Sequence, residues 1–104
     1  MEAFGKYISK KRKMLRMHQK ELAQQITKED GTPISAQYLN DIERGRRNPP
    51  SEDMIIQIAE VLEESADYLQ FLAGRIPNDI GSDLPPEKFE AAMKAFRKEI
   101  DTDS

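Results

Sequence analysis

The side chains best suited to recognition chemistry lie in one short segment, residues 35–44. At about 100° per residue, Tyr38, Leu39 and Ile42 fall on one face of a helix. The opposite face carries a small residue, two amides and two charged groups: Ala36, Gln37, Asn40, Asp41 and Arg44. Amides can bond to adenine, a carboxylate can accept from the cytosine amino group, and alanine suits the thymine methyl. The pattern indicates a base-reading helix; the alternative is an ordinary polar face on which Asp41 pairs with Arg44.

A basic cluster, Arg44-Gly45-Arg46-Arg47-Asn48, follows this face directly. Guanidinium groups and the asparagine amide are good donors to phosphate oxygens. We therefore expect the chain to pass a sugar–phosphate backbone here, with a solvated charge run as the alternative. The run Lys10-Lys11-Arg12-Lys13 is less specific, and its lysines would add long-range attraction to an anionic partner.

The net charge of −3 for 104 residues conceals a polarised chain. Residues 1–50 contain 11 basic and 6 acidic side chains, which gives +5, whereas residues 51–104 contain 5 and 13, which gives −8. An acidic total therefore does not exclude nucleic-acid binding through a basic face.

Catalysis and metal binding are disfavoured by the residue types that are missing. There is no Cys and only one His, so thiolate chemistry is excluded and a His-based metal site lacks partners. No nucleophile elbow or glycine-rich phosphate loop is present. We expect a non-enzyme without cofactor or metal, in which His18 caps a helix with Glu21 or contacts phosphate. The absence of a visible signal peptide or long apolar run predicts a cytoplasmic protein.

The elements that must position these residues all show helical spacing, so the sequence predicts an all-α chain. We expect a first helix at residues 4–16 and a second that starts near 19 and carries apolar residues up to 26. Further helices are expected at 35–44, after 51, at 65–74 and at 85–100. The first of these should bury the apolar stripe Phe4, Tyr7, Ile8, Met14 and Leu15. Lys11 falls inside that stripe, where its aliphatic stem could lie on the core while the ammonium reaches water.

Three segments together resemble the lambda-repressor/Cro-type helix-turn-helix family, also called XRE. They are Gln19-Lys20-Glu21-Leu22-Ala23, Ile34 through Leu39 with Ile42-Glu43-Arg44-Gly45, and Ser65 through Leu72. The resemblance covers roughly residues 4–73. It implies a five-helix DNA-binding domain whose second helix crosses the DNA backbone and whose third lies in the major groove.

The resemblance also implies roles for single residues. Base edges would be faced by Ala36, Gln37, Asn40 and Asp41. Phosphate would be contacted by Gln19 at the start of the second helix. Arg12 would pair with Glu43 and so tie the first helix to the third. Independently of the resemblance, we expect further phosphate contacts from His18, Lys20, Arg44, Arg46, Arg47 and Asn48.

Two features depart from the family pattern. Residues 27–33 replace the usual short turn between helices two and three, an insertion that either lengthens helix two or forms a loop. The acids in this insertion would be unfavourable beside phosphate. Lys11 occupies a position that the family normally fills with an apolar residue.

We divide the chain into a DNA-binding domain (1–74), a linker (75–84), and a C-terminal amphipathic helix with a short acidic tail (85–104). The last helix carries the stripe Phe89, Met93, Phe96 and Ile100. Such a stripe must be covered, by the domain, by a second copy or by another protein.

The leading hypothesis is a sequence-specific DNA-binding transcriptional regulator, a repressor that binds a pseudo-palindromic operator as a homodimer. The competing hypothesis is an antitoxin or adaptor that acts mainly through the C-terminal helix.

Overall fold

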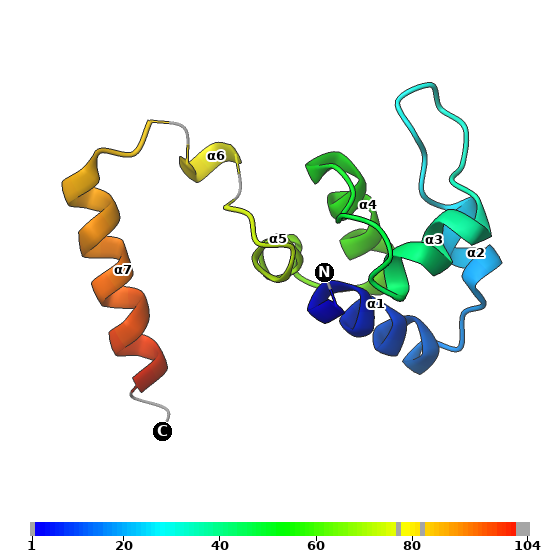
Figure 1. The fold of residues 1–104 in the computed structure, drawn as a ribbon, viewed down its shortest axis with the longest axis horizontal. Helices are drawn as coiled ribbons and strands as arrows, with labels where there is room; N and C mark the ends of the chain where they lie inside the picture. Colours follow the sequence, from blue (N-terminus) through cyan, green and yellow to red (C-terminus); the bar gives the residue numbers. More distant parts are fainter. Residues whose placement is uncertain (1, 77, 82, 102–104) are drawn as a thin grey trace.

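The structure, a computed structural model, describes residues 2–76, 78–81 and 83–101. Within these ranges the regular secondary structure is helical, apart from an isolated antiparallel bridge between Thr27 and Pro33. The helices are α1 (Glu2–Met14), α2 (Gln19–Gln24), α3 (Ala36–Glu43), α4 (Glu52–Leu62), α5 (Ala66–Leu72), α6 (Asn78–Gly81) and α7 (Pro86–Asp101) (Figure 1). The predicted all-α fold, with a five-helix domain and an additional C-terminal helix, is confirmed.

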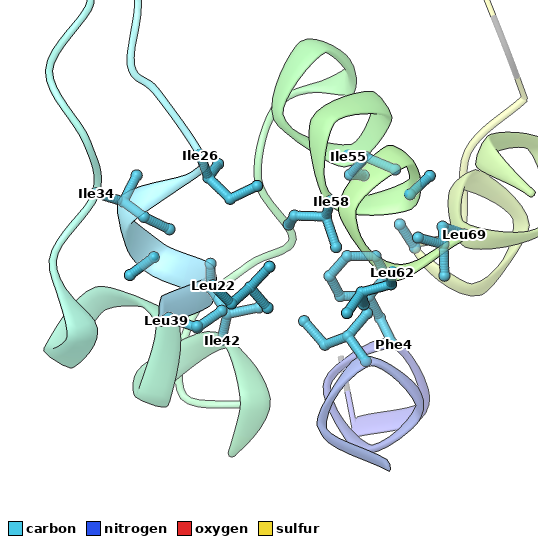
Figure 2. Close-up of a cluster of buried hydrophobic side chains, with 14 residues drawn as sticks. Phe4, Leu22, Ile26, Ile34, Leu39, Ile42, Ile55, Ile58, Leu62 and Leu69 are labelled. Atoms are coloured by element: carbon cyan, nitrogen blue, oxygen red, sulfur yellow. The ribbon is translucent and has the colours of Figure 1, made fainter. Parts of the chain in front are cut away.

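Helices α1–α5 enclose one apolar core (Figure 2). Every one of these helices contributes to it, and its most deeply buried large side chains are Phe4, Ile8, Leu22, Ile26, Leu39, Ile42, Ile55, Ile58 and Leu69. Burying a side chain of this size contributes about 1.5–3 kcal/mol, so the core outweighs the weak helix-forming tendency of short segments such as α2. The core therefore fixes where α3 lies relative to α1 and α4.

Serine caps set the starts of three helices. The Oγ atoms of Ser35, Ser51 and Ser65 accept hydrogen bonds from the backbone N–H three residues later, at 3.0, 3.3 and 3.2 Å. Each bond satisfies a backbone donor that has no partner inside its helix. The start of α3 is therefore fixed by a hydrogen bond within its own first turn.

The first helix ends earlier than the apolar spacing predicts. It stops at Met14 rather than Arg16, because Arg16 adopts a left-handed conformation with φ of 57° and the chain turns. Met14 and Leu15 are 63% and 41% exposed, so the expectation that they would be buried is wrong. Met17, on the far side of the turn, packs against the core in their place.

Lys11 is held by an acid from the other end of the domain. Its Nζ lies 2.6 Å from a carboxylate oxygen of Glu64, which also accepts a 2.9 Å hydrogen bond from the Tyr7 hydroxyl. These two contacts, that with Lys11 first, hold the pKa of Glu64 below its ordinary value, and the same pair raises the pKa of Lys11. Where the resemblance predicts an apolar residue, Lys11 therefore forms an ion pair that joins α1 to the segment between α4 and α5.

The 27–33 insertion forms a loop and does not lengthen α2, which ends at Gln24. The loop, cyan in Figure 1, projects from the domain beyond α2 and α3. Its base is held by the Gln57 side chain of α4, whose Oε1 accepts from the Thr27 backbone N–H at 2.8 Å and whose Nε2 donates to the Thr27 carbonyl at 3.1 Å. In the tip, Thr32 donates to Asp30 through its hydroxyl and backbone N–H, which lowers the pKa of that carboxyl group.

The C-terminal part contains one short helix that the sequence did not predict. The predicted linker contains the short helix α6, and Arg75 at its start is half-buried against the domain. Helix α7 has no buried residue and lies beside the domain rather than over it (Figure 1). Its Phe96 ring is centred 6.2 Å from Phe71 of α5, whereas Phe89 and Ile100 stay exposed and Met93 is half-buried.

Candidate nucleic-acid interface

Helix α3 presents the polar face that the sequence analysis singled out. Leu39 and Ile42 are buried, Ala36, Asn40 and Asp41 are half-buried, and Gln37 is exposed. The Gln37 amide Nε2 donates to Asp41 Oδ1 at 3.0 Å. Gln37 thereby keeps its carbonyl oxygen and one N–H available for a base edge.

The C-terminal end of α3 is fixed to α1 by a buried ion pair. Arg12 donates from Nε and Nη2 to the two carboxylate oxygens of Glu43, at 2.7 and 2.9 Å. Its Nη1 donates to the Met17 carbonyl at 2.7 Å. The side chains are only 8% and 4% exposed, so both charges depend on each other rather than on water. The structure thus contains the Arg12–Glu43 pair that the resemblance implies.

Gln19, at the start of α2, joins this pair to the recognition face. Its Nε2 donates to Glu43 Oε1 and to Asn40 Oδ1, both at 3.0 Å. Since a carboxylate can only accept, the amide nitrogen of Gln19 must point inward, and its neighbour on Asn40 must be the oxygen. Gln19 is half-buried, and this relay uses both of its amide hydrogens. Because the remaining Oε1 can only accept, a side-chain hydrogen bond from Gln19 to a phosphate requires the relay to open.

The same relay decides what Asn40 can offer to DNA. Its Oδ1 accepts from both Gln19 and Arg44 Nε, the latter at 3.3 Å, so both acceptor positions are used. The Nδ2 group remains as a donor. In this arrangement Asn40 can donate to a base or phosphate oxygen, but a bidentate contact to adenine requires the relay to open.

A left-handed glycine brings the basic cluster beside this face. Gly45 has φ of 73°, its N–H donates to the Ile42 carbonyl at 3.1 Å, and the Arg46 N–H donates to the Asp41 carbonyl at 2.8 Å. These are the two bonds of a Schellman motif, which ends α3 and reverses the chain. Arg44, Arg46, Arg47 and Asn48 all emerge exposed from this turn.

The alternative Asp41–Arg44 pair is not among the described contacts of these arginines. Arg44 turns to Asn40, whereas Arg46 and Arg47 each approach the Asp41 carboxylate at 3.9 Å. The Arg47 guanidinium also lies 4.6 Å from the centre of the Tyr38 ring, a cation–π distance. Asp41 is thus surrounded by donors, and its charge is already partly balanced before any contact with DNA.

The start of α2 supplies the other side of the candidate interface. His18 and Lys20 are exposed, and the Glu21 carboxylate accepts a 3.0 Å hydrogen bond from the His18 backbone N–H. This bond is one half of the predicted capping box. The imidazole of His18 is left at the surface beside Lys20.

Two residues that position the interface were not identified from the sequence. Arg75 donates from Nη1 to the Pro50 carbonyl and from Nη2 to the Pro49 carbonyl at 3.3 Å, which holds the end of the loop that carries the arginine cluster. Glu64 secures α1 through Lys11 and Tyr7. Neither pairing has a local sequence signal, because the partners are 25 or more residues apart.

The comparisons with known proteins come to one finding. A family model described as helix-turn-helix matches residues 8–69, more than half of the chain. The chain belongs to this helix-turn-helix family. The match supports the lambda-repressor/Cro (XRE) type, and the helix-turn-helix protein is accordingly a DNA-binding transcriptional regulator. Neither a curated protein nor a solved structure matched the chain.

Two further observations describe the helix-turn-helix protein outside this interface. In the described ranges, no group of three or more His, Asp and Glu side chains is arranged to hold a metal ion. No helix there is long and apolar enough to cross a membrane.

Proposed function

We propose that the protein is a sequence-specific repressor that reads operator DNA with α3 in the major groove. The proposal rests on the contrast between the two faces of α3. One face is locked by Leu39, Ile42 and the Arg12–Glu43 pair, while the opposite face holds the exposed Gln37 beside Asp41. A rigid helix with a short hydrogen-bonding face is what base recognition needs.

In the proposed complex, Ala36, Gln37 and Asp41 read base edges, and Asn40 contributes its free amide donor. Phosphates on the two sides of the groove are contacted from the start of α2 by His18, Lys20 and, once its hydrogen bonds to Glu43 and Asn40 open, Gln19. From the turn after α3 they are contacted by Arg44, Arg46, Arg47 and Asn48. If about five phosphates are neutralised by each protomer, log K should fall with log salt with a slope near −4.5.

The proposed assembly is a homodimer. Two copies of α3 about 34–36 Å apart would meet successive major grooves of a pseudo-palindromic operator, and occupation of promoter DNA would block transcription. The exposed apolar groups of α7 and Phe71 support a second copy as the cover for this surface.

The test begins with selection of bound sites from random DNA, followed by mobility shifts on the selected site. Gln37→Ala should cost about 1–3 kcal/mol of discrimination for that site while binding to random DNA stays unchanged. Gln24→Ala is the matched control, since Gln24 is exposed on α2 and its side chain makes no hydrogen bond among the described residues. Equal effects of the two substitutions would refute base reading by α3.

A second candidate, an antitoxin or adaptor acting through α7, is favoured by the same exposed stripe. Deletion of residues 85–104 separates the two. For a repressor dimerised by α7, the truncated chain should be monomeric and lose most of its affinity for a two-half-site operator. A truncated chain that stays dimeric and binds the operator normally assigns α7 to another protein partner.

A further inference from the structure

One face of α1 gathers basic side chains that neither the core nor the interface described above uses. Lys6, Ser9, Lys10 and Lys13 follow one another at i, i+3, i+4 and i+7, so they form a single stripe along the helix. The stripe borders a surface groove whose other wall is the end of α3, at Glu43, Arg44 and Arg46. We call this the α1–α3 groove.

The lysines of the groove have no described carboxylate partner, unlike their neighbour Lys11. Lys11, on another face of α1, is paired with Glu64 at 2.6 Å. Among the side chains that the structure describes, which do not include that of Glu2, no carboxylate lies within 4.0 Å of Lys6, Lys10 or Lys13. Like charges at i,i+4, such as Lys6 and Lys10, disfavour the helix unless an anion balances them.

The acid on the floor of the groove does not repel an incoming anion strongly. Glu43 is 7% exposed, and its carboxylate is matched by both arms of Arg12 and by Gln19. The field in the groove therefore comes from the three lysines together with Arg44 and Arg46, which are exposed. Ser9 adds a hydroxyl donor between the lysines.

The groove is continuous with the candidate DNA interface. Its inner end is lined by Ser9 and Lys13 of α1 together with Gln19, Asn40 and Arg44. From Lys6 to Lys13 the stripe is about 10 Å long at 1.5 Å per residue. One strand of duplex DNA carries a phosphate about every 3.4 Å along the duplex axis, and successive phosphates lie farther apart along the winding strand. A straight stripe about 10 Å long can therefore contact about two phosphates of one strand.

We propose that the α1–α3 groove binds the phosphodiester backbone of one DNA strand, beside the groove in which α3 reads bases. This inference rests on the proposed function, and it assigns to Lys6, Ser9, Lys10 and Lys13 direct phosphate contacts. The contacts carry no sequence information; they hold α1, and through the Arg12–Glu43 pair α3, in one register on the duplex.

The test compares salt dependence of binding for Lys6→Gln/Lys13→Gln in the full chain with that of Lys94→Gln/Lys98→Gln, which removes the same charge from exposed positions of α7. Probes are a duplex containing the selected site and a duplex of random sequence. Loss of two phosphate contacts should reduce the slope of log K against log salt by about 1.8 on both probes. Between 50 and 200 mM salt, the affinity of the wild type should therefore fall about 12-fold more than the affinity of the variant.

Lys6→Arg/Lys13→Arg should restore the wild-type slope, because the charges are kept. The α7 control should leave the slope unchanged. A groove variant that keeps the wild-type slope and melting temperature overturns the inference. If the wild type itself shows no salt-dependent binding to either probe, the proposed function fails rather than the assignment of the groove.

Discussion

The Arg12–Glu43 pair provides the most decisive test of how the fold holds its recognition helix. Arg12→Met keeps most of the side-chain volume but removes three hydrogen bonds, two to Glu43 and one to the Met17 carbonyl. Glu43 would keep only the Gln19 amide as partner for a carboxylate that is 4% exposed. Breaking a buried ion pair by removing one partner costs about 3–5 kcal/mol. The remaining Gln19 bond places the expected loss near the lower value, about 3 kcal/mol.

Urea unfolding followed by helical circular dichroism measures this loss. With a slope of about 1.5 kcal/mol per molar urea, the midpoint should fall by about 2 M. Lys11→Met is the neighbouring control: its ion pair with Glu64 is more exposed, so its midpoint should fall less. Arg12→Met/Glu43→Leu should recover a large part of the loss, because no unpaired carboxylate remains.

Two outcomes would refute this reasoning. The first is an Arg12→Met midpoint no lower than that of Lys11→Met. The second concerns Arg12→Met/Glu43→Leu. If its loss of unfolding free energy equals the sum of the losses measured for Arg12→Met and for Glu43→Leu alone, the two residues do not interact in solution.

Two further predictions concern how α1 is seated. Gly5→Ala should destabilise the protein by about 1–3 kcal/mol despite the better helix propensity of alanine, because its Cβ would overlap the carbonyl oxygens of Ile42 and Glu43 in α3; a melting temperature at or above that of the wild type contradicts this close approach. Glu64 has its pKa lowered by Lys11 and Tyr7, so its stabilisation is present above the ordinary value of 4.5 and is lost as pH falls through the lower folded value. Glu64→Gln should therefore melt below the wild type at pH 7 and converge with it in acid; identical melting temperatures at pH 7 would show that the Glu64 contacts do not stabilise the fold.

The local features of the domain followed from sequence patterns. Serine caps at 35, 51 and 65 and the glycine at 45 act within a few residues, so their positions in the sequence predict where α3, α4 and α5 begin and where α3 ends. The apolar spacing located Leu39 and Ile42 on the buried face of α3 for the same reason. It failed at Met14, the last residue of α1, and at Leu15, because the helix ends there and the chain turns at the left-handed Arg16.

The sequence by itself thus determined the helical class, the polar face of α3 and, through family resemblance, the Arg12–Glu43 pair. The tertiary structure decided which atoms of that face remain free. Gln19 lies 21 residues from Asn40, and only their packing together uses up the Asn40 oxygen and leaves its amide donor. The α1–α3 groove likewise exists only because two distant segments meet. Periodicity reports which way a side chain points along its own helix, whereas its hydrogen-bond partners and unbalanced charges depend on what the fold brings beside it.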